Sequence, residues 1–202
     1  MKMKYFLKPP SPGKVEKILE EHRLSPFSYP DVGLTLGSAT TAKNEPIKNY
    51  QLDTYRVSLG KGDDNFKKAK KHFENWEMFS LDWIHLYPRK QAIKEGVMVG
   101  VLAKVLGIWV LNLCRIVHTV YEERVISFSY GTLDSHAEKG EEKFSVLWSE
   151  ENDEVYYEIT AFSRPNLWMA KLGYPYVRML QKRFGRDSLE KMRELTVGGG
   201  GF

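Results

Sequence analysis

The stretch of residues 141–162, EEKFSVLWSEENDEVYYEITAF, decides the fold, because apolar and polar residues alternate on both sides of a polar loop. If residues 150–153 form the loop, the two flanking segments pair as an antiparallel hairpin and their apolar residues fall on one face. The pairs predicted on this face are Trp148 with Val155, Val146 with Tyr157, and Phe144 with Ile159. The hairpin therefore has an apolar inner face and a polar outer face.

One carboxylate interrupts the apolar inner face. The alternation places Glu142 there, opposite Ala161, whereas the outward side chains are Lys143, Ser145, Glu158 and Thr160. A carboxylate on the helix-facing side of a sheet must be paired, hydrated or protonated, because an unpaired buried charge is costly. We therefore expect Glu142 to line a pocket with a raised pKa, unless Arg164, His136 or another cation compensates for its burial.

Other predicted strands surround this hairpin. Strand patterns cover residues 81–87, 97–106, 108–121, 125–130, 141–148 and 155–162, and turns separate them, which predicts an antiparallel sheet. An earlier strand at residues 55–59 leads into a helix that ends near Trp76. The last helical region, residues 166–195, is interrupted at 173–175, and Pro175 opens its longer helix. This order predicts an α+β helix-grip fold, a curved antiparallel sheet of about seven strands around a long C-terminal helix, with a cavity between them.

The N-terminal part has a different pattern. Pro12 opens a short predicted helix that ends near Arg23, and proline and glycine residues make residues 25–49 irregular. We expect three parts: an N-terminal helix and irregular arm packing on the body at residues 1–48, the helix-grip domain at 49–197, and a flexible glycine-rich tail at 198–202.

A long apolar run at residues 96–114 has one charge, Lys104, and is long enough to test as a membrane helix. The charge lies near its middle, five valines favour extended structure, and Gly107 divides the run into two strand-length pieces. We therefore expect two buried strands joined by a tight turn, and no stable membrane insertion.

Composition limits the cellular setting and the partners. The 202 residues include 30 basic and 26 acidic side chains, and this small excess does not indicate nucleic-acid binding. The chain has one cysteine, Cys114, which excludes an internal disulfide and fits a reducing compartment. Residues 1–10 lack the pattern of a secretory signal. A cytoplasmic protein is therefore expected. A basic stripe on the last helix, Arg178, Lys182 and Arg186, is expected to be solvent-exposed because acidic residues follow it. The oligomeric state stays open.

No motif of a known reaction is present in the sequence. The segment Gly60-Lys61-Gly62 resembles a phosphate-binding loop, but Asn65 replaces the third glycine and two aspartates follow. The polar stretch 130–144 holds side-chain types that bind metals or transfer protons, without a recognised metal-ligand spacing: His136, Glu138, Glu141 and Glu142. A charged hairpin loop is favoured there over a pocket mouth, and both are favoured over a metal or catalytic site. No cofactor, metal or catalytic residue is assigned.

Several segments resemble one known family. They are WEMFSLDWIHLYP at residues 76–88, YGTLDSHAEKGEEKF at 130–144, AFSRPNLWMAKLGYPYVRMLQKRFGRDSLEKM at 161–192, YPDVGLT at 29–35 and YRVSLGKG at 55–62. Together they cover nearly the whole chain and resemble the family called domain of unknown function 1990, which is grouped with the Bet v 1-like, or START-like, superfamily. The resemblance implies a hydrophobic cavity used for lipids, sterols, polyketides or plant metabolites, and sometimes for cyclase or hydrolase chemistry. It supplies no catalytic residues.

These observations favour a non-enzymatic protein that binds an apolar or amphipathic small molecule, lipid-like or polyketide-like, between the sheet and the helix after Pro175. The predicted apolar wall consists of Phe128, Tyr130, Phe144, Val146, Tyr157, Ile159, Val177 and Leu180. Glu142 and Ser163 are expected to orient the ligand, with His136 and Arg164 at the rim. Two alternatives stay open: a cyclase or hydrolase in which Glu142 acts as acid or base, and an interaction or regulatory protein whose cavity is filled by side chains.

Overall fold

The computed structural model describes residues 4–36, 50–88, 91–134, 136, 138–165 and 174–198. Its helical elements are α1 (Pro12–Glu21), η1 (Leu34–Leu36), α2 (Gly62–Glu74), η2 (Glu77–Phe79) and α4 (Tyr174–Val197). Its strands are β1 (Lys4–Phe6), β2 (Gln51–Lys61), β3 (Ile84–Tyr87), β4 (Met98–Val105), β5 (Ile108–Tyr121), β6 (Val125–Thr132), β7 (Glu138–Trp148) and β8 (Glu154–Pro165).

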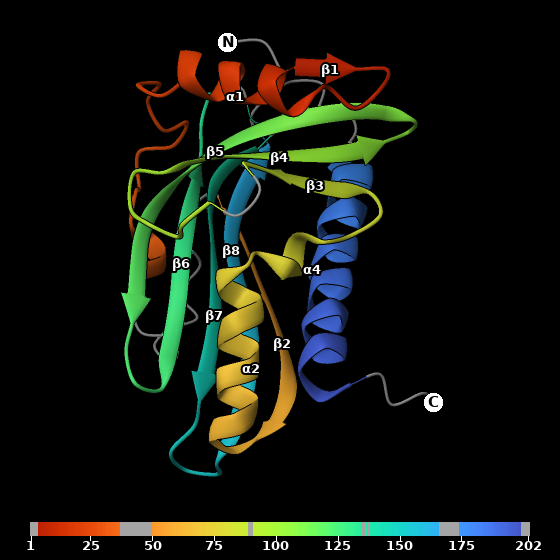
Figure 1. The fold of residues 1–202 in the computed structure, drawn as a ribbon. Coiled ribbons are helices and arrows are strands. Elements are labelled where there is room, and N and C mark those ends of the chain that lie inside the picture. The colour runs from red at the N-terminus through yellow and green to blue at the C-terminus, as the bar shows by residue number, and fades with distance from the viewer. Residues whose placement is uncertain are drawn as a thin grey trace.

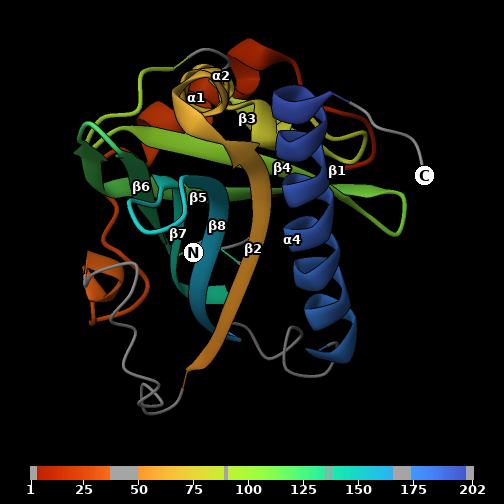
Figure 2. The same ribbon diagram turned by 90° about the horizontal axis from the view of Figure 1, so that it is seen from below.

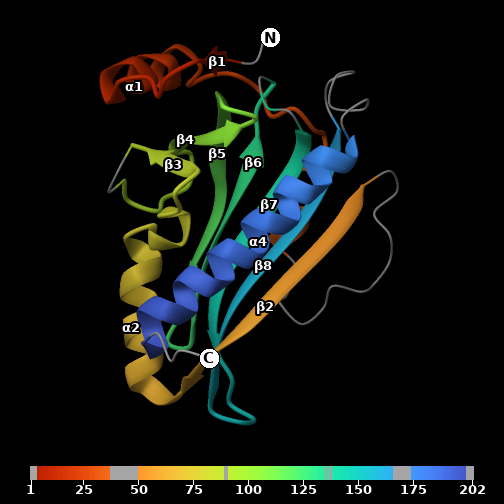
Figure 3. The same cartoon turned by 90° about the vertical axis from the view of Figure 1, so that its right-hand side faces the viewer.

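The strands form one antiparallel sheet in the order β2-β8-β7-β6-β5-β4-β3, and β1 pairs with β5. The sheet curls, and the long helix α4 lies along its concave side, with α2 beside the C-terminal half of α4 (Figures 1 and 3). In the perpendicular view, β2 lies next to α4, and the ribbon of β4 and β5 crosses behind both of them (Figure 2). The predicted helix-grip fold is therefore confirmed.

The register of the β7–β8 hairpin is the one predicted from the alternation of its residues. Trp148 pairs with Val155, Phe144 with Ile159, and Glu142 with Ala161. Both strands extend beyond their predicted limits, and β7 begins at Glu138, three residues earlier than expected. The extension carries the pairing into the polar stretch, which therefore belongs largely to a strand and not to a loop.

The apolar run at residues 96–114 forms two strands, as predicted. Strands β4 and β5 are joined by Leu106 and Gly107, whose φ angles are 49° and 82°. Positive φ at both central residues is the geometry of a type I′ turn, which matches the twist of the paired strands. Among the described residues, no helix is both long and apolar enough to cross a membrane.

Some predicted boundaries were wrong. The strand expected at residues 81–87 includes only Ile84–Tyr87, because residues 82 and 83 form a turn after η2. The predicted helical stretch at 166–173, much of the irregular arm and the end of the tail lie outside the described residues. The division of the chain into three parts stays a prediction.

The N-terminal segments cover the convex face of the sheet. Strand β1, which was not predicted, pairs with β5, and α1 packs its apolar side on the outer residues of β4 and β5. Farther along the sheet, Glu141 accepts hydrogen bonds from Tyr29 Oη at 2.7 Å, from the Gly33 amide at 2.9 Å and from Thr35. The Glu141 carboxylate therefore anchors the segment around η1 to the back of the sheet, away from α4.

The main core lies between the concave face and the C-terminal half of α4. Aromatic side chains fill this region, and five of them are fully buried: Phe73, Phe79, Phe128, Phe144 and Tyr157. Near the middle of α4 the Phe184 ring lies 5.3 Å from that of Phe79. In the C-terminal half Met192 is buried in the core, and the buried Ser188 Oγ is hydrogen-bonded to Tyr157 Oη at 2.9 Å. This half of α4 is thus held by close packing around a satisfied polar pair.

Candidate functional site

A cavity of about 470 Å³ lies between the concave face and the N-terminal half of α4. Its volume is within the range of roughly 300 to 1,000 Å³ that is typical of small-molecule sites. The apolar part of its wall comes from β2, β4, β5 and α4, with Tyr55, Val101, Ala103, Val105, Val110, Tyr176, Val177, Leu180 and Phe184. The polar part comes mainly from β7, β8 and the start of β2.

Small side chains explain why this part of the concave face is hollow. The residues that face the cavity from β7 and β8 include Gly140, Ala161 and Ser163, and β4 contributes Val101 and Ala103. Farther along β7 and β8 the corresponding inner positions carry large side chains, including Phe144 and Tyr157, which reach α2 and α4. The same sheet therefore supports a filled region and a hollow one.

Glu142 lies in the cavity wall, as predicted from the hairpin register. Tyr130 Oη donates a hydrogen bond of 2.6 Å to Glu142 Oε2. Burial raises the pKa of Glu142 to about 7, the Tyr130 hydrogen bond opposes this shift, and the charge of Asp53 adds to it. The position of Glu142 and the direction of its pKa shift agree with what the hairpin register and burial predict. Near neutral pH this carboxyl is divided between its charged and neutral forms.

A second carboxylate, Glu138, lies on the same face of β7 and is only 8% exposed. Gln181 Nε2 donates to its Oε2 at 2.6 Å, and Ser163 Oγ donates to its Oε1 at 3.4 Å. Burial raises the pKa of Glu138 to about 7, and the Glu142 charge raises it further, while Gln181, Arg178 and Ser163 oppose the shift. The cavity thus has two carboxyls with pKa values near neutrality.

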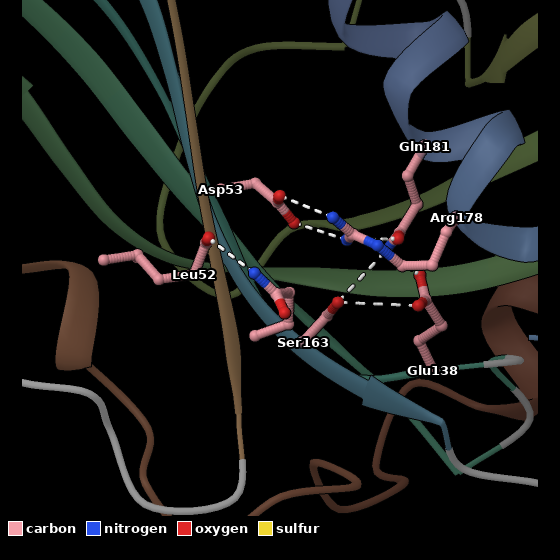
Figure 4. Close-up of polar contacts among 7 residues, drawn as sticks. Leu52, Asp53, Glu138, Ser163, Arg178 and Gln181 are labelled. Carbon is pink, nitrogen blue, oxygen red and sulfur yellow. Dashed lines mark hydrogen bonds and ion pairs between the residues drawn. The ribbon is translucent and has the colours of Figure 1, made fainter. Parts of the chain in front are cut away.

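An ion pair closes the polar end. The Arg178 guanidinium from α4 binds both carboxylate oxygens of Asp53 on β2, with Nη2 2.6 Å from Oδ1, and each side chain is only 15% exposed. Arg178 Nη1 also donates to Gln181 Oε1 at 2.7 Å. Figure 4 shows these groups converging with Ser163 and Glu138 from four different elements. Polar contacts therefore tie the start of α4 to β2 and β7.

The basic stripe predicted on the last helix is therefore only partly correct. Lys182 and Arg186 are exposed, but Arg178 is largely buried against Asp53. The prediction failed for Arg178 because its partner lies 125 residues away in the sequence, on a strand that was predicted too short to include Asp53.

His136 lines the cavity in a neutral form. The backbone N–H of Glu138 donates to His136 Nδ1 at 3.0 Å. Burial lowers the pKa of His136 to about 4. At neutral pH the imidazole therefore supplies no positive charge to compensate Glu142.

The structure divides the predicted site residues into two groups. Those that line the cavity are Tyr130, His136, Glu142, Ser163, Val177 and Leu180. Those expected in the wall but found in the packed core are Phe128, Phe144, Val146, Tyr157 and Ile159, all at 0% exposure. Placing this second group in the wall was wrong, because side chains from α2, η2 and α4 fill the space in front of them.

Arg164 was also misplaced at the pocket rim. Its neighbour Ser163 faces the cavity, so Arg164 points to the convex side, where its guanidinium carbon lies 4.8 Å from the Tyr50 ring centroid. Sequence reasoning missed Asp53 and Gln181 at the site. Alternation along β2 puts Asp53 on the face of Tyr55, and helical spacing puts Gln181 on the face of Val177, so both positions had a detectable signal.

A curved antiparallel sheet that grips a C-terminal helix over a cavity defines the class of helix-grip proteins, which includes the Bet v 1-like and START-like proteins. The hypothetical protein jhp0584 from Helicobacter pylori is similar in fold, with a TM-score of 0.54 and 13% identity, covering 75% of this chain and 91% of that one. The di-domain ARO/CYC StfQ from the steffimycin biosynthetic pathway is also similar, with a TM-score of 0.50 and 9% identity, covering 73% of this chain and 51% of that one. At these identities the similarity concerns the fold alone.

The chain belongs to the family described as "Domain of unknown function (DUF1990)", whose model matches residues 28–191. A UPF0548 protein of Dictyostelium discoideum is 34% identical, and the match covers 93% of this chain and 94% of that protein. The resemblance seen in the sequence is therefore confirmed.

Proposed function

We propose that this protein binds one amphipathic small molecule, lipid-like or polyketide-like, in the cavity between the sheet and the N-terminal half of α4. The observation that carries the proposal is the cavity itself, about 470 Å³ in volume, with a largely apolar wall and polar groups gathered at one end. Apolar surface supplies binding free energy of about 25 cal/mol per Å² removed from water. A few polar groups at one end would fix the orientation of the ligand.

Two observations support binding over the alternative functions. An open cavity of this size argues against an interaction protein whose interior is filled. A hydrogen-bonded acid–base pair of Glu142 with His136 would favour catalysis. Instead, Glu142 accepts a hydrogen bond from Tyr130, and His136 accepts one from a backbone amide.

Two neighbouring residues of α4 provide a matched test. Leu180 lines the cavity, whereas Met179 is 51% exposed. Leu180→Trp should fill part of the cavity, and Met179→Trp should leave it unchanged. Binding of the uncharged fluorescent probe N-phenyl-1-naphthylamine should saturate at one site in the natural protein and in Met179→Trp, and should weaken at least about tenfold in Leu180→Trp.

Absence of saturable binding in the natural protein contradicts the proposal. Equal affinity in the two tryptophan variants contradicts the location of the site. Circular dichroism and thermal unfolding of both variants should establish that the fold is retained before affinities are compared.

A further inference from the structure

Charges around the cavity are strongly unbalanced. The described residues that line it include Asp53, Glu138, Glu141 and Glu142 but no lysine or arginine. The Glu141 carboxylate is held on the convex side by Tyr29, Gly33 and Thr35, which leaves three carboxylates at the polar end. Asp53 is neutralised by its two hydrogen bonds with Arg178. The remaining two, Glu138 and Glu142, have no ion pair within the described part of the chain.

The hydrogen-bond donors to these two carboxylates are neutral groups. Glu142 receives the Tyr130 hydroxyl, and Glu138 receives the Gln181 amide and the Ser163 hydroxyl. Because the two carboxylates carry like charges, the ionisation of one makes the ionisation of the other less favourable. The two residues lie four apart on one face of β7, and Gly140, between them, also lines the cavity and has no side chain.

An amide oxygen on β5 also lacks a hydrogen-bond donor. Asn112 on β5 also lines the cavity, and its buried Oδ1 has no hydrogen-bond partner among the described residues. A buried acceptor without a donor costs about 1 to 3 kcal/mol, and a hydrogen-bond donor brought by a ligand would reduce this cost.

We infer, building on the proposed function, that the ligand is an amphiphilic amine, with an apolar body against β4 and α4 and a protonated nitrogen held by Glu138 and Glu142. An ammonium group supplies both the positive charge and the hydrogen-bond donors that this end of the cavity lacks. A carboxylate or phosphate head group would instead face two like charges in a poorly hydrated space, where repulsion is strong. Within the described residues, no group of three or more His, Cys, Asp or Glu side chains is arranged to hold a metal ion, which favours an organic cation.

Three amphiphiles with the same twelve-carbon chain separate the contribution of the head group to binding from that of the apolar body. Dodecylammonium, dodecanol and dodecanoate should each displace N-phenyl-1-naphthylamine, used below their micelle-forming concentrations. Near pH 8 the amine should bind most tightly and the carboxylate most weakly, with at least about a tenfold difference between them, because Glu138 and Glu142 are then mainly ionised.

Variants with glutamine identify the groups responsible. Glu138→Gln and Glu142→Gln keep the side-chain shape and one acceptor oxygen but remove the charge. Each substitution should weaken the affinity for dodecylammonium at least about fivefold and leave the affinity for dodecanol unchanged. The double variant should lose the preference for the amine. Glu151→Gln is the matched control, because it removes the same charge from an exposed residue in the β7–β8 turn.

The outcomes distinguish this inference from the proposed function. If the probe binds but dodecanol or dodecanoate binds as tightly as dodecylammonium, the inferred ammonium site is wrong, whereas the proposed ligand cavity is retained. If the preference for the amine survives in the double variant, the assignment to Glu138 and Glu142 is wrong. If the probe does not bind the natural protein, the proposed function itself fails. Unchanged probe affinity in each variant verifies that its cavity is intact.

Discussion

The two halves of α4 meet the same sheet in opposite ways. The C-terminal half packs against the core through Leu189 and Met192, and the Ser188 hydroxyl is hydrogen-bonded to Tyr157 in a fully buried contact. The N-terminal half lies over a cavity and is held by Arg178 and Gln181 through polar contacts. The difference follows from side-chain size on the sheet. A few small residues at one end of β4, β7 and β8 leave room for a ligand, while large ones at the other end provide the core.

A matched pair of truncations should expose this difference most strongly. Ile159→Ala in the filled half and Leu180→Ala in the hollow half each remove three carbons from a side chain. Ile159 is fully buried, so its truncation should lower the free energy of unfolding by about 3 to 4 kcal/mol. Leu180 already faces the cavity, so its loss should cost about 1 kcal/mol. Urea unfolding at constant pH measures both values, and equal losses would show that the two halves are packed alike.

Titration of Glu142 should give a smaller effect, confined to the hollow half. Its pKa rises from 4.5 to about 7 on folding, so the folded state binds the proton more tightly. The stabilising contribution is therefore complete below about pH 4.5 and is lost as the pH rises through 7. Glu142→Gln lacks this titration. Between about pH 5 and pH 8 the natural protein should lose about 2 to 3 kcal/mol of unfolding free energy relative to this variant.

Chemical denaturation of the two proteins at several pH values checks the prediction. Glu151→Gln, with its exposed carboxyl, should follow the natural protein throughout. A constant difference between the natural protein and Glu142→Gln would mean that this carboxyl titrates at the same pH in the folded and unfolded states.

Alternation along the strands was sufficient to predict the register of β7 with β8 and the inward position of Glu142. It indicates which face a residue occupies but not how far along the concave surface the neighbouring helices reach. For this reason Phe144 and Tyr157 were placed in the cavity wall, although α2 and η2 cover them. The contact between Asp53 and Arg178 joins segments far apart in the sequence, so no local pattern pairs them. Strand β1 is three residues long and carries too short a pattern to detect.

The location of a bound probe tests the central claim most directly, namely that the hollow half of the concave face is the ligand site. A crystal structure of the protein saturated with N-phenyl-1-naphthylamine should show one molecule among β4, β7 and the N-terminal half of α4, in contact with Val101 and Leu180. The surroundings of Phe144 should stay unchanged. A probe bound between α2 and the C-terminal half of α4, or on the convex face under α1, would contradict the account.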